Sequence, residues 1–482
     1  MRRTVGALLA PAVFLGLLAL PLPGLSPEAH RLAAVMGAVV VLWVTEALPL
    51  PVTALLGACA CVVLEVAPVK EVFAPFADPL MFLFIGAFIL ARGIFLHGLD
   101  RRVAYAVLSL PWVGARPARI LIAFGAATAL ISAWISNTAS TAMMFGIGLS
   151  ILSALRSRTA GGEIDPRYAT ALMLMTSFAA SVGGLATPVG TPPNLIGLGF
   201  IRSQLGVEVT FFHWMLIGIP VVTVLFGFLA VYLNVVGPSG VRELPGGAEL
   251  IRQEREQLGA WTPGQRSVAF AFVLTVALWV LPGVAALVWG AGSPQYLALS
   301  RRMPEGVAAL VGASLLFVLP GKDGPAITWR EATEIDWGVV LLYGGGFALG
   351  VLSFKTGLAE GLGRALTGLL PLHGSFGLLV ASVLLAAILS ETTSNTASAN
   401  MVVPVVIAIG RASGLDPTEA ALGATFGSSL GFMLPVSTPC NAIVYGSGYI
   451  PLGRMIRWGL ALDVVGVVVI IALIRLLSPL VR

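Results

Sequence analysis

The sequence predicts an all-α polytopic membrane protein with about eleven transmembrane helices. Of its 482 residues, 57% are hydrophobic and only 11% are charged, whereas soluble domains carry roughly 25% charged residues. Apolar windows of roughly 20 residues, long enough to cross a bilayer, recur from one end of the chain to the other. The longest polar stretch, 236–265, is too short for a soluble domain and is interpreted as a cytoplasmic linker.

Hydropathy gives the order of the predicted elements. The N-terminal window resembles a signal peptide, but about 17 apolar residues followed by a proline-rich turn fit a first transmembrane helix better, within a unit of residues 1–30. Two later windows, 118–153 and 376–410, carry a polar centre, and two more are interrupted by Pro and Gly. The remaining windows lie near 5–22, 32–48, 50–66, 78–96, 213–235, 267–288, 304–320, 337–353 and 456–477.

The two halves of the chain resemble each other. The pentapeptide Ser-Asn-Thr-Ala-Ser begins at Ser136 and again 258 residues later, at Ser394. Similar apolar stretches surround both copies, which indicates a weak internal repeat of 31–235 against 266–482. Each unit contains about five spans and one polar-centred region. If that region does not cross the bilayer, the odd number of crossings inverts the second unit, as in many transporters.

The polar centres predict re-entrant hairpins. The apolar arms on either side of Ser136–Ser140 are about 15 residues long, too short to cross a hydrocarbon core of roughly 30 Å. Non-helical backbone at this depth is tolerated only where it lines a cavity or is buried in protein. We therefore expect one hairpin over 118–153 and a second, entering from the opposite side, over 376–410.

A Thr-Pro-x-Asn motif follows each hairpin, at 191–194 and at 438–441. Because proline interrupts a helix, 168–201 and 418–449 are each predicted to be two half-helices with an unwound joint. Unwound joints offer carbonyls to small cations, and half-helix N-termini favour anions. Oxygen ligands suit a hard cation such as Na⁺, and no Arg or Lys lies near these polar cores in the sequence. The residues thus predict a site where bound cations attract an anion.

Charge and cysteine usage indicate orientation and exclude other classes. A cytoplasmic N-terminus and an external C-terminus place most of the 28 Lys and Arg at the cytoplasmic face. No basic patch with interleaved aromatics predicts a nucleic-acid partner, and no motif predicts an organic cofactor. The cysteines lie in apolar sequence and are interpreted as packing residues, not disulfides or metal ligands: Cys59, Cys61 and Cys440.

At these motifs the sequence resembles the divalent anion:sodium symporter family of bacterial di- and tricarboxylate carriers. The two Ser-Asn-Thr signatures, the Gly-Thr-Pro-Pro-Asn joint and the stretch Leu42–Leu56 carry the resemblance, which covers nearly the whole chain. It implies Na⁺-coupled symport of C4-dicarboxylates such as succinate, malate or fumarate across the inner membrane, and no enzymatic activity. It also implies a homodimer in the lipid bilayer, whose transport domain slides against a scaffold by an elevator movement.

The resemblance further implies two sodium sites and a substrate site, carried over position by position. The sodium sites use equivalent residues in the two halves: Ser132, Ser136, Asn137 and the Gly190 carbonyl in the first, and Ser390, Ser394, Asn395 and the Ser437 carbonyl in the second. The substrate carboxylates would contact Asn137, Thr138, Thr191, Pro192, Asn395, Thr396, Thr438 and Pro439.

The second joint departs from the first. Ser437 and Cys440 stand where the first joint has Gly190 and Pro193, a difference that could change ion affinity or substrate choice. Glu391, beside the second tip, is interpreted as shaping the hairpin or taking a proton. Other residues have structural interpretations: a helix cap or a scaffold pair for Glu46, helix N-caps for Asp78 and Asp336, and close helix packing for Gly344–Gly346.

Other functions stay open at the level of sequence. The same fold would serve an exchanger of dicarboxylates, a carrier of tricarboxylate or sulfate, or a passive anion channel. A Gly-x-Ser-x-Gly pattern around Ser429 would fit an intramembrane serine hydrolase, although no strand precedes it and no histidine lies nearby in the sequence. The residues identify neither the transported anion nor the number of coupled sodium ions.

Overall fold

The computed structural model describes residues 2–158, 165–241, 243, 247–290, 292–367 and 374–481. Within these ranges the chain is all-helical and contains no named strand, as predicted. Residues 1 and 482, which bound the first and last predicted units, and residues 242 and 244–246 of the predicted linker lie outside this part of the chain.

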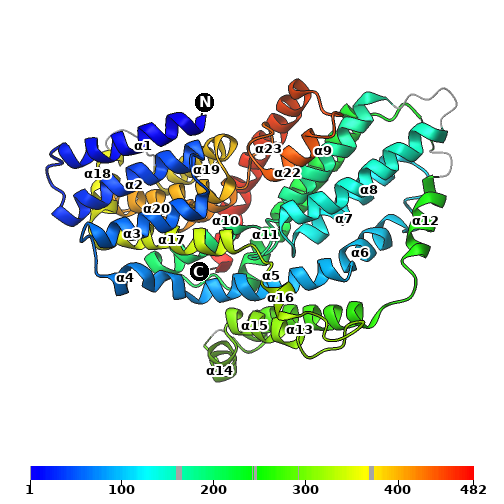
Figure 1. Cartoon of the computed structure of the whole chain (residues 1–482), viewed down its shortest axis with the longest axis horizontal. Helices are drawn as coiled ribbons and strands as arrows, with labels where there is room; N and C mark the ends of the chain where they lie inside the picture. The colour runs from blue at the N-terminus through cyan, green and yellow to red at the C-terminus, as the bar shows by residue number, and fades with distance from the viewer. Residues whose placement is uncertain are drawn as a thin grey trace.

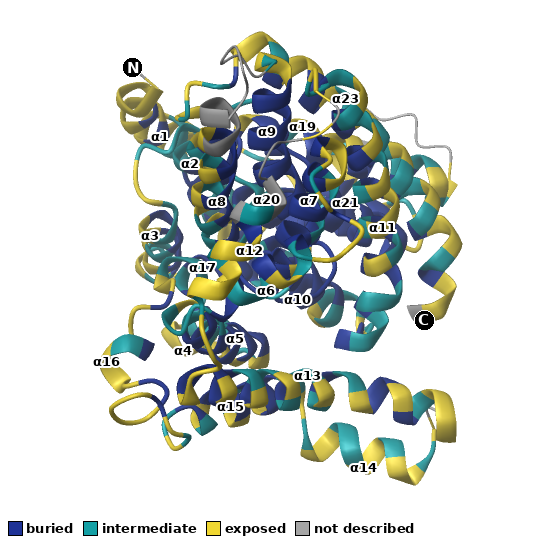
Figure 2. Ribbon diagram, turned by 90° about the vertical axis from the view of Figure 1, so that its right-hand side faces the viewer, coloured by how far each residue is buried: buried dark blue, intermediate teal, exposed yellow. Residues whose placement is uncertain are grey.

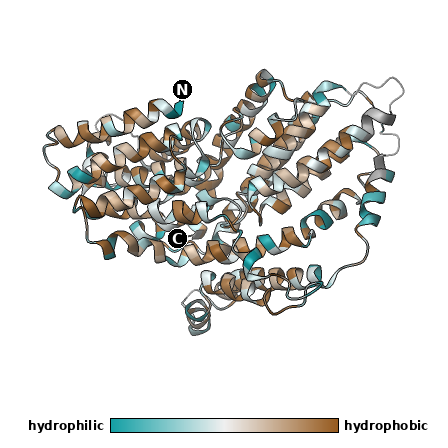
Figure 3. Cartoon of the chain, in the orientation of Figure 1, coloured by the Kyte–Doolittle hydropathy of each residue, from teal (hydrophilic) through white to brown (hydrophobic). Residues whose placement is uncertain are grey.

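Eight of the described helices are long and apolar enough to cross a membrane, so the chain is a multi-pass membrane protein. Three shorter helices are also apolar: α3 (Leu50–Val63), α7 (Pro117–Ser132) and α15 (Glu305–Leu315). Figure 3 shows apolar residues along most of the helices. The eight long helices are α1 (Arg2–Ala19), α2 (Pro27–Thr45), α5 (Pro79–Leu96), α11 (Phe211–Val236), α13 (Pro263–Trp289), α17 (Trp337–Lys355), α19 (Gly374–Thr392) and α23 (Leu452–Leu477).

Two apolar regions are folded as a helix, a short turn and a second helix. α7 is followed after 133–136 by α8 (Asn137–Arg158), and α19 is followed after 393–394 by α20 (Asn395–Ala412). The arms contain 16, 22, 19 and 18 residues, so the first arm agrees with the predicted length of roughly 15 residues and the other three are longer. The polar residues around each turn were predicted to form a non-helical tip. Most of them are helical and lengthen the arms.

Two further segments are interrupted near their centres. α9 (Pro166–Gly183) and α10 (Pro192–Phe200) are separated by 184–191, and α21 (Thr418–Gly427) and α22 (Pro439–Tyr445) by 428–438. Both α10 and α22 begin with proline at the first helical position, where the missing N–H would have no intrahelical partner in any case. A π-helical turn, η2 (Ile201–Leu205), continues α10.

The remaining helices are short or connect these units. Figure 1 shows α12 at the end of the molecule that carries α8, and α13, α14 and α15 along one side. Their bounds are α4 (Val69–Phe73), η1 (Ala74–Ala77), α6 (Leu99–Leu108), α12 (Gly247–Gln257), α14 (Pro294–Arg302), α16 (Trp329–Ala332), α18 (Leu358–Thr367) and η3 (Ser478–Val481).

Matched helix pairings relate the two halves of the chain. α7 packs on α9 in the first half as α19 packs on α21 in the second, and the contact of α3 with α17 between the halves is matched by that of α15 with α5. The short helices cross between the halves, because α10 packs on α20 and α21 while α22 packs on α8 and α9. α9 is buried from Tyr168 to Gly183, and Figure 2 shows it within the dark blue interior.

Close helix approach depends on glycine, as predicted for Gly344–Gly346. A β-carbon at Gly345 would lie 2.6 Å from that of Ala54 in α3, and one at Gly344 would lie 2.5 Å from the Phe76 ring. Small residues at such crossings let backbones approach within van der Waals distance. The contact between α17 and α3 therefore depends on the absence of a side chain at Gly345.

Helix caps and cysteines were also given structural roles from the sequence. Asp78 and Asp336 accept hydrogen bonds from Leu80 N and Val339 N, which confirms both as helix N-caps. The backbone of Glu46 ends α2 in a left-handed conformation (φ 50°), so this residue caps the helix. All three cysteines are free, and Cys61 and Cys440 are buried. Cys59 is exposed, so it does not pack in the interior as Cys61 does. Positions two apart on a helix are about 200° apart and cannot share the buried face.

A substitution at Gly183 tests the docking of α7 on α9. Its β-carbon would overlap the carbonyl group of Ala129, so Gly183→Ala should lower stability by about 1–3 kcal/mol through overpacking. Gly227→Ala in α11 is the matched control, because nothing lies within 4 Å of its β-carbon position; it should leave the melting temperature unchanged or raise it. Thermal unfolding of both variants in detergent checks this contact, and an unaltered Gly183→Ala protein would contradict it.

Candidate functional site

The first polar tip joins the end of α7 to the start of α8. Ser132, the last residue of α7, donates a hydrogen bond from its hydroxyl to Asn137 Oδ1 (2.8 Å). Ser136 caps α8, because its Oγ accepts a hydrogen bond from Ala139 N (3.3 Å). The tip therefore presents a hydroxyl and an amide oxygen side by side at the N-terminus of a helix.

The second tip repeats this arrangement. Ser390 donates to Asn395 Oδ1 at the same 2.8 Å, and Ser394 Oγ accepts from Ala397 N (3.2 Å). Ser390 also donates to the carbonyl oxygen of Ser428 (2.7 Å), which ties the second tip to the segment after α21. The paired sequence motifs thus fold into paired hydrogen-bond patterns.

Each tip lies against the unwound joint that follows it in the chain. A β-carbon at Gly184, where the first joint begins, would overlap the amide of Asn137. The equivalent atom at Gly431 in the second joint would lie 3.4 Å from Asn395 Oδ1. Glycine at 184 therefore allows Asn137 to pack directly on the backbone of the first joint, whereas the contact at Gly431 has an ordinary van der Waals distance.

An asparagine closes each joint from within. Asn194 donates from Nδ2 to the carbonyls of Gly184 (2.9 Å) and Thr187 (2.8 Å). Asn441 donates in the same way to Gly431 (2.9 Å) and Leu434 (3.0 Å). Buried carbonyls without an intrahelical partner need a donor, and the last residue of each Thr-Pro-x-Asn motif supplies it. Each asparagine belongs to a motif that the sequence shows, but no pattern in the sequence predicts this role.

The departure between the two joints has a steric explanation. A β-carbon at Gly190 would lie 2.5 Å from the Gly184 carbonyl oxygen and 3.0 Å from that of Ala133, so the first joint has no room for a side chain there. In the second joint, Ser437 donates to the carbonyl oxygen (3.0 Å) and to Oε2 (2.7 Å) of Glu391.

Glu391 fastens the second tip to the second joint. Its Oε1 accepts from Met433 N (2.8 Å) while its Oε2 accepts from Ser437. The equivalent position in the first tip is Ala133, whose carbonyl accepts from Thr187 Oγ1 (2.5 Å). Glu391 therefore shapes the second hairpin, and only the second tip holds a carboxylate at this position.

Contacts also run between the two halves. Thr138 and Thr141 of α8 lie against the Cys440 thiol in α22, and Ser177 of α9 donates to Asn441 Oδ1 (2.5 Å). Among the described residues, no hydrogen bond joins Asn137 or Thr138 to Asn395 or Thr396. The structure links each tip to the joint beside it, and it links the first tip to the short helix of the other half.

The expected site residues differ in exposure. Several have solvent-accessible atoms and could meet a ligand directly: Thr138 and Pro439 are exposed, while Ser136, Asn137, Pro192, Ser394, Asn395 and Thr396 are half-buried. The others are buried: Ser132, Gly190, Thr191, Ser390, Ser437 and Thr438.

One basic side chain reaches the second tip. Arg2 in α1 donates from Nη2 to the carbonyl oxygen of Thr392 (2.7 Å). No Arg or Lys lies near this polar core in the sequence, and the fold brings one there from α1. Arg2 and Thr392 are 390 residues apart in the chain, and no local pattern in the sequence predicts the contact.

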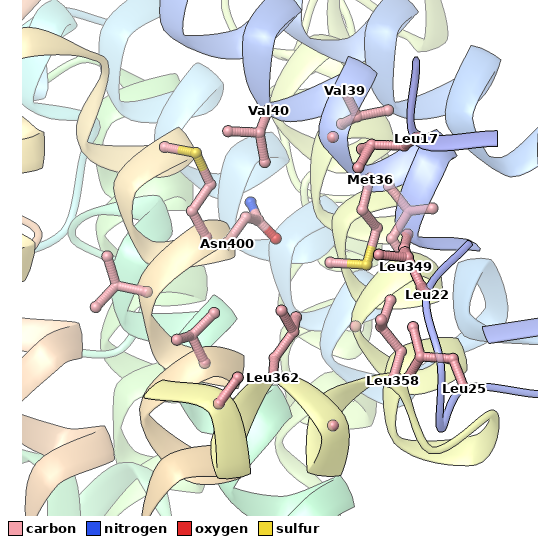
Figure 4. Close-up of a pocket in the computed structure, with 18 of the residues that line it drawn as sticks. Leu17, Leu22, Leu25, Met36, Val39, Val40, Leu349, Leu358, Leu362 and Asn400 are labelled. Atoms are coloured by element: carbon pink, nitrogen blue, oxygen red, sulfur yellow. The ribbon is translucent and has the colours of Figure 1, made fainter. Parts of the chain in front are cut away.

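A cavity of about 920 Å³ lies elsewhere, between α1, α2, α17, α18 and α20. Figure 4 shows Asn400 among apolar side chains that include Met36, Leu349 and Leu358. Apart from Asn400 and Arg364, the lining side chains are apolar, and such a surface does not suit a small dianion. The two tips, with their hydroxyls and helix N-termini, suit an anion better than this cavity does.

The Gly-x-Ser-x-Gly pattern does not form a catalytic group among the described residues. Ser429 is buried, and its hydroxyl has no hydrogen-bond partner. His30, His97 and His213 bond instead to Leu17, Ala326 and Thr210, respectively. No described histidine is in position to act as a base for Ser429.

Comparisons with known proteins agree with this fold. Residues 2–481 match the family described as "Sodium:sulfate symporter transmembrane region". Proteins named sodium-dependent dicarboxylate transporter SdcS, from Staphylococcus saprophyticus and Staphylococcus aureus, are 32% identical over 98% and 99% of this chain and 91% of each relative. The solved YdaH transporter of Alcanivorax borkumensis matches with a TM-score of 0.54 and 17% identity, covering 84% of this chain and 86% of that one. This last likeness concerns the fold alone.

Replacing Asn194 tests the closure of the first joint. Asn194→Ala leaves the Gly184 and Thr187 carbonyls without their side-chain donor, which should cost about 1–3 kcal/mol. Asn234→Ala in α11 is the matched control, because Asn234 donates only to Ala230 O within its own helix (2.8 Å). The melting temperatures of the purified variants check the difference. Equal melting temperatures would show that the joint does not depend on Asn194.

Proposed function

This chain belongs to the sodium:sulfate symporter family, and we propose that it carries C4-dicarboxylates such as succinate, malate or fumarate into the cell by symport with Na⁺. The observation that carries the proposal is the matched pair of tips, each with a Ser–Asn hydrogen bond of 2.8 Å packed on an unwound joint. Two staphylococcal relatives are named sodium-dependent dicarboxylate transporters, which supports both sodium dependence and a dicarboxylate substrate.

Two sodium sites are proposed at the tips. Each would combine hydroxyls, an amide oxygen and a joint carbonyl, a set of oxygen ligands that suits a hard monovalent cation. The first would use Ser132, Ser136, Asn137 and the Gly190 carbonyl; the second would use Ser390, Ser394, Asn395 and the Ser437 carbonyl. The hydrogen bonds between Ser132 and Asn137 and between Ser390 and Asn395 support this grouping, because they hold the proposed ligand atoms together.

The substrate would bind where helices begin. α8 and α20 start at Asn137 and Asn395, and α10 and α22 start at Pro192 and Pro439. Helix N-termini carry partial positive charge and unpaired amides, which favour carboxylates. The proposed contacts are Asn137, Thr138, Thr191, Pro192, Asn395, Thr396, Thr438 and Pro439.

Bound sodium would supply most of the charge that a dicarboxylate needs, since the described basic side chain at the tips is Arg2 alone. Sodium binding would therefore precede substrate binding and raise the affinity for it, and each ligand would raise the affinity for the other by the same factor. This linkage would couple uptake to the sodium gradient.

Two inverted repeats and an elevator movement complete the proposal. The matched pairings of α3 with α17 and α15 with α5 support the repeats. The transport domain would hold both re-entrant hairpins and both broken helices, the rest would form the scaffold, and the protein would be a homodimer in the inner membrane with a cytoplasmic N-terminus. Arg202 binds Asp78 (2.6 and 2.7 Å), and Tyr343 donates to the same carboxylate (3.2 Å); this contact would join the two domains and break during movement.

Sulfate is the second candidate substrate, because the description of the family names it. The two staphylococcal relatives, which cover almost the entire chain, favour dicarboxylate instead.

Uptake into proteoliposomes tests symport. An inward Na⁺ gradient should drive succinate uptake above equilibrium, whereas a matched K⁺ gradient should not, and sulfate and citrate measured in parallel test the substrate class. Uptake that requires preloaded internal dicarboxylate would indicate an exchanger. Flux that no gradient can drive uphill would indicate a channel, and either result would contradict the proposal.

Replacing the tip asparagines tests the shared ligands. Asn137→Ala and Asn395→Ala should each weaken both Na⁺ and succinate affinity, by about tenfold or more, since each residue is proposed at a sodium site and at the substrate site. Uptake rates over ranges of both concentrations check this, with Asn234→Ala as the control. Normal transport by either variant would contradict the site assignment.

A further inference from the structure

A buried carboxylate without a partner lies near the middle of α23. Asp463 is 7% exposed, and neither of its carboxylate oxygens has a hydrogen-bond partner. It lies well inside a span that runs from Leu452 to Leu480. An unpaired carboxylate at this depth is costly and marks an ion or proton site by default.

The geometry of α23 directs Asp463 toward the second joint. Gly459, Asp463 and Gly466 are spaced four and three residues apart, so they share one helix face. A β-carbon at Gly459 would lie 2.5 Å from the Phe432 carbonyl carbon, and one at Gly466 would lie 2.8 Å from Leu430. The two glycines bring this face against the joint, and the carboxylate lies between them.

A second carboxylate lies opposite. The Asp463 carboxyl group lies against that of Glu391 and against the Phe432 backbone amide. Glu391 is 5% exposed. Both Glu391 oxygens already accept one donor each, from Met433 N and Ser437 Oγ. An ionised Glu391 therefore has no proton with which to form a hydrogen bond to the oxygens of Asp463.

No described basic side chain offsets this pair. Arg475 on α23 binds Glu419 (2.9 Å), Arg454 bonds to Thr170 (3.1 Å), and Arg457 is exposed. Within the part of the chain that the structure describes, the charged side chain that acts on Asp463 is Glu391, and its charge has the same sign. The titratable and charged groups on the helices packed against α23 are Glu391 on α19, Glu419 on α21, and His213 and Tyr232 on α11.

We propose that Asp463 and Glu391 hold a further sodium ion between them, separate from the sites at the two tips. A sodium ion coordinates several oxygens at once, so it can satisfy both orphaned oxygens of Asp463 and part of Glu391. A shared proton would satisfy only one oxygen of Asp463. The ion would fix α23, the second tip and the second joint together. This inference rests on the proposed sodium coupling, and it adds a site that has no equivalent in the first half, where Ala133 replaces Glu391.

Sodium-dependent thermal unfolding of the full-length protein, without substrate, tests the site. In sodium-free buffer, Asp463→Asn should be at least as stable as wild type, because an amide replaces a buried charge. Added sodium, at constant ionic strength, should then raise the melting temperature of the variant less than that of wild type. The part of the stabilisation that comes from this site should need about tenfold more sodium, or more, to reach half of its maximum. Glu391→Gln should lose the same component. Asp336→Asn, an exposed helix cap, is the matched control and should respond to sodium as wild type does.

The outcomes separate this inference from the proposed function. A wild-type sodium response in Asp463→Asn would overturn the site while leaving sodium coupling intact. A variant that keeps its full sodium response but loses a pH dependence of stability seen in wild type would indicate a shared proton, which also overturns the site. Absence of any sodium response in wild type would remove the proposed coupling and this site together.

Discussion

The structure depends on one constraint: backbone polar groups in the interior of a membrane protein must find partners inside the protein. Helices satisfy themselves, but α9–α10 and α21–α22 are interrupted, and their joints leave carbonyls with no helical partner. Asn194 and Asn441 supply the missing donors, and each lies in the first turn of the helix that follows its joint. Because these joints are closed, each can support a tip, and the tips can present oxygen atoms in an apolar surrounding.

Differences between the halves are as informative as their likeness. The backbone around Gly190 leaves no room for a side chain, whereas the second joint has Ser437 at the equivalent position. Ala133 in the first tip stands where the second tip has Glu391, which accepts hydrogen bonds from Met433 and Ser437. Arg2 reaches only the second tip, and Asp463 faces only the second joint. Both halves contain a tip and an unwound joint, but these charged side chains lie at the tip and joint of the second half. The two half-sites are expected to bind ions unequally, although their Ser–Asn hydrogen bonds have the same length.

Local patterns made much of the fold predictable. Hydropathy located the helices, and the motifs located both tips and both joints, because proline and polar residues act on the backbone within a few residues. Features that depend on packing were not predictable. Cys59 was interpreted as a packing residue, whereas it is exposed. Three of the four hairpin arms are longer than predicted, because polar residues beside the turns continue the helices. The contacts of Arg2 with Thr392 and of Asp463 with Glu391 join distant segments, and neither has a signature in the sequence.

The central claim is that sodium creates the anion site, so the most direct measurement is succinate binding to the purified protein at a series of sodium concentrations. Isothermal titration calorimetry at constant ionic strength, with K⁺ replacing Na⁺, should show succinate affinity rising with sodium and no detectable binding in K⁺ alone. Equal succinate affinity in Na⁺ and K⁺ would contradict the account, because the tips would then recognise the anion without a coupled cation.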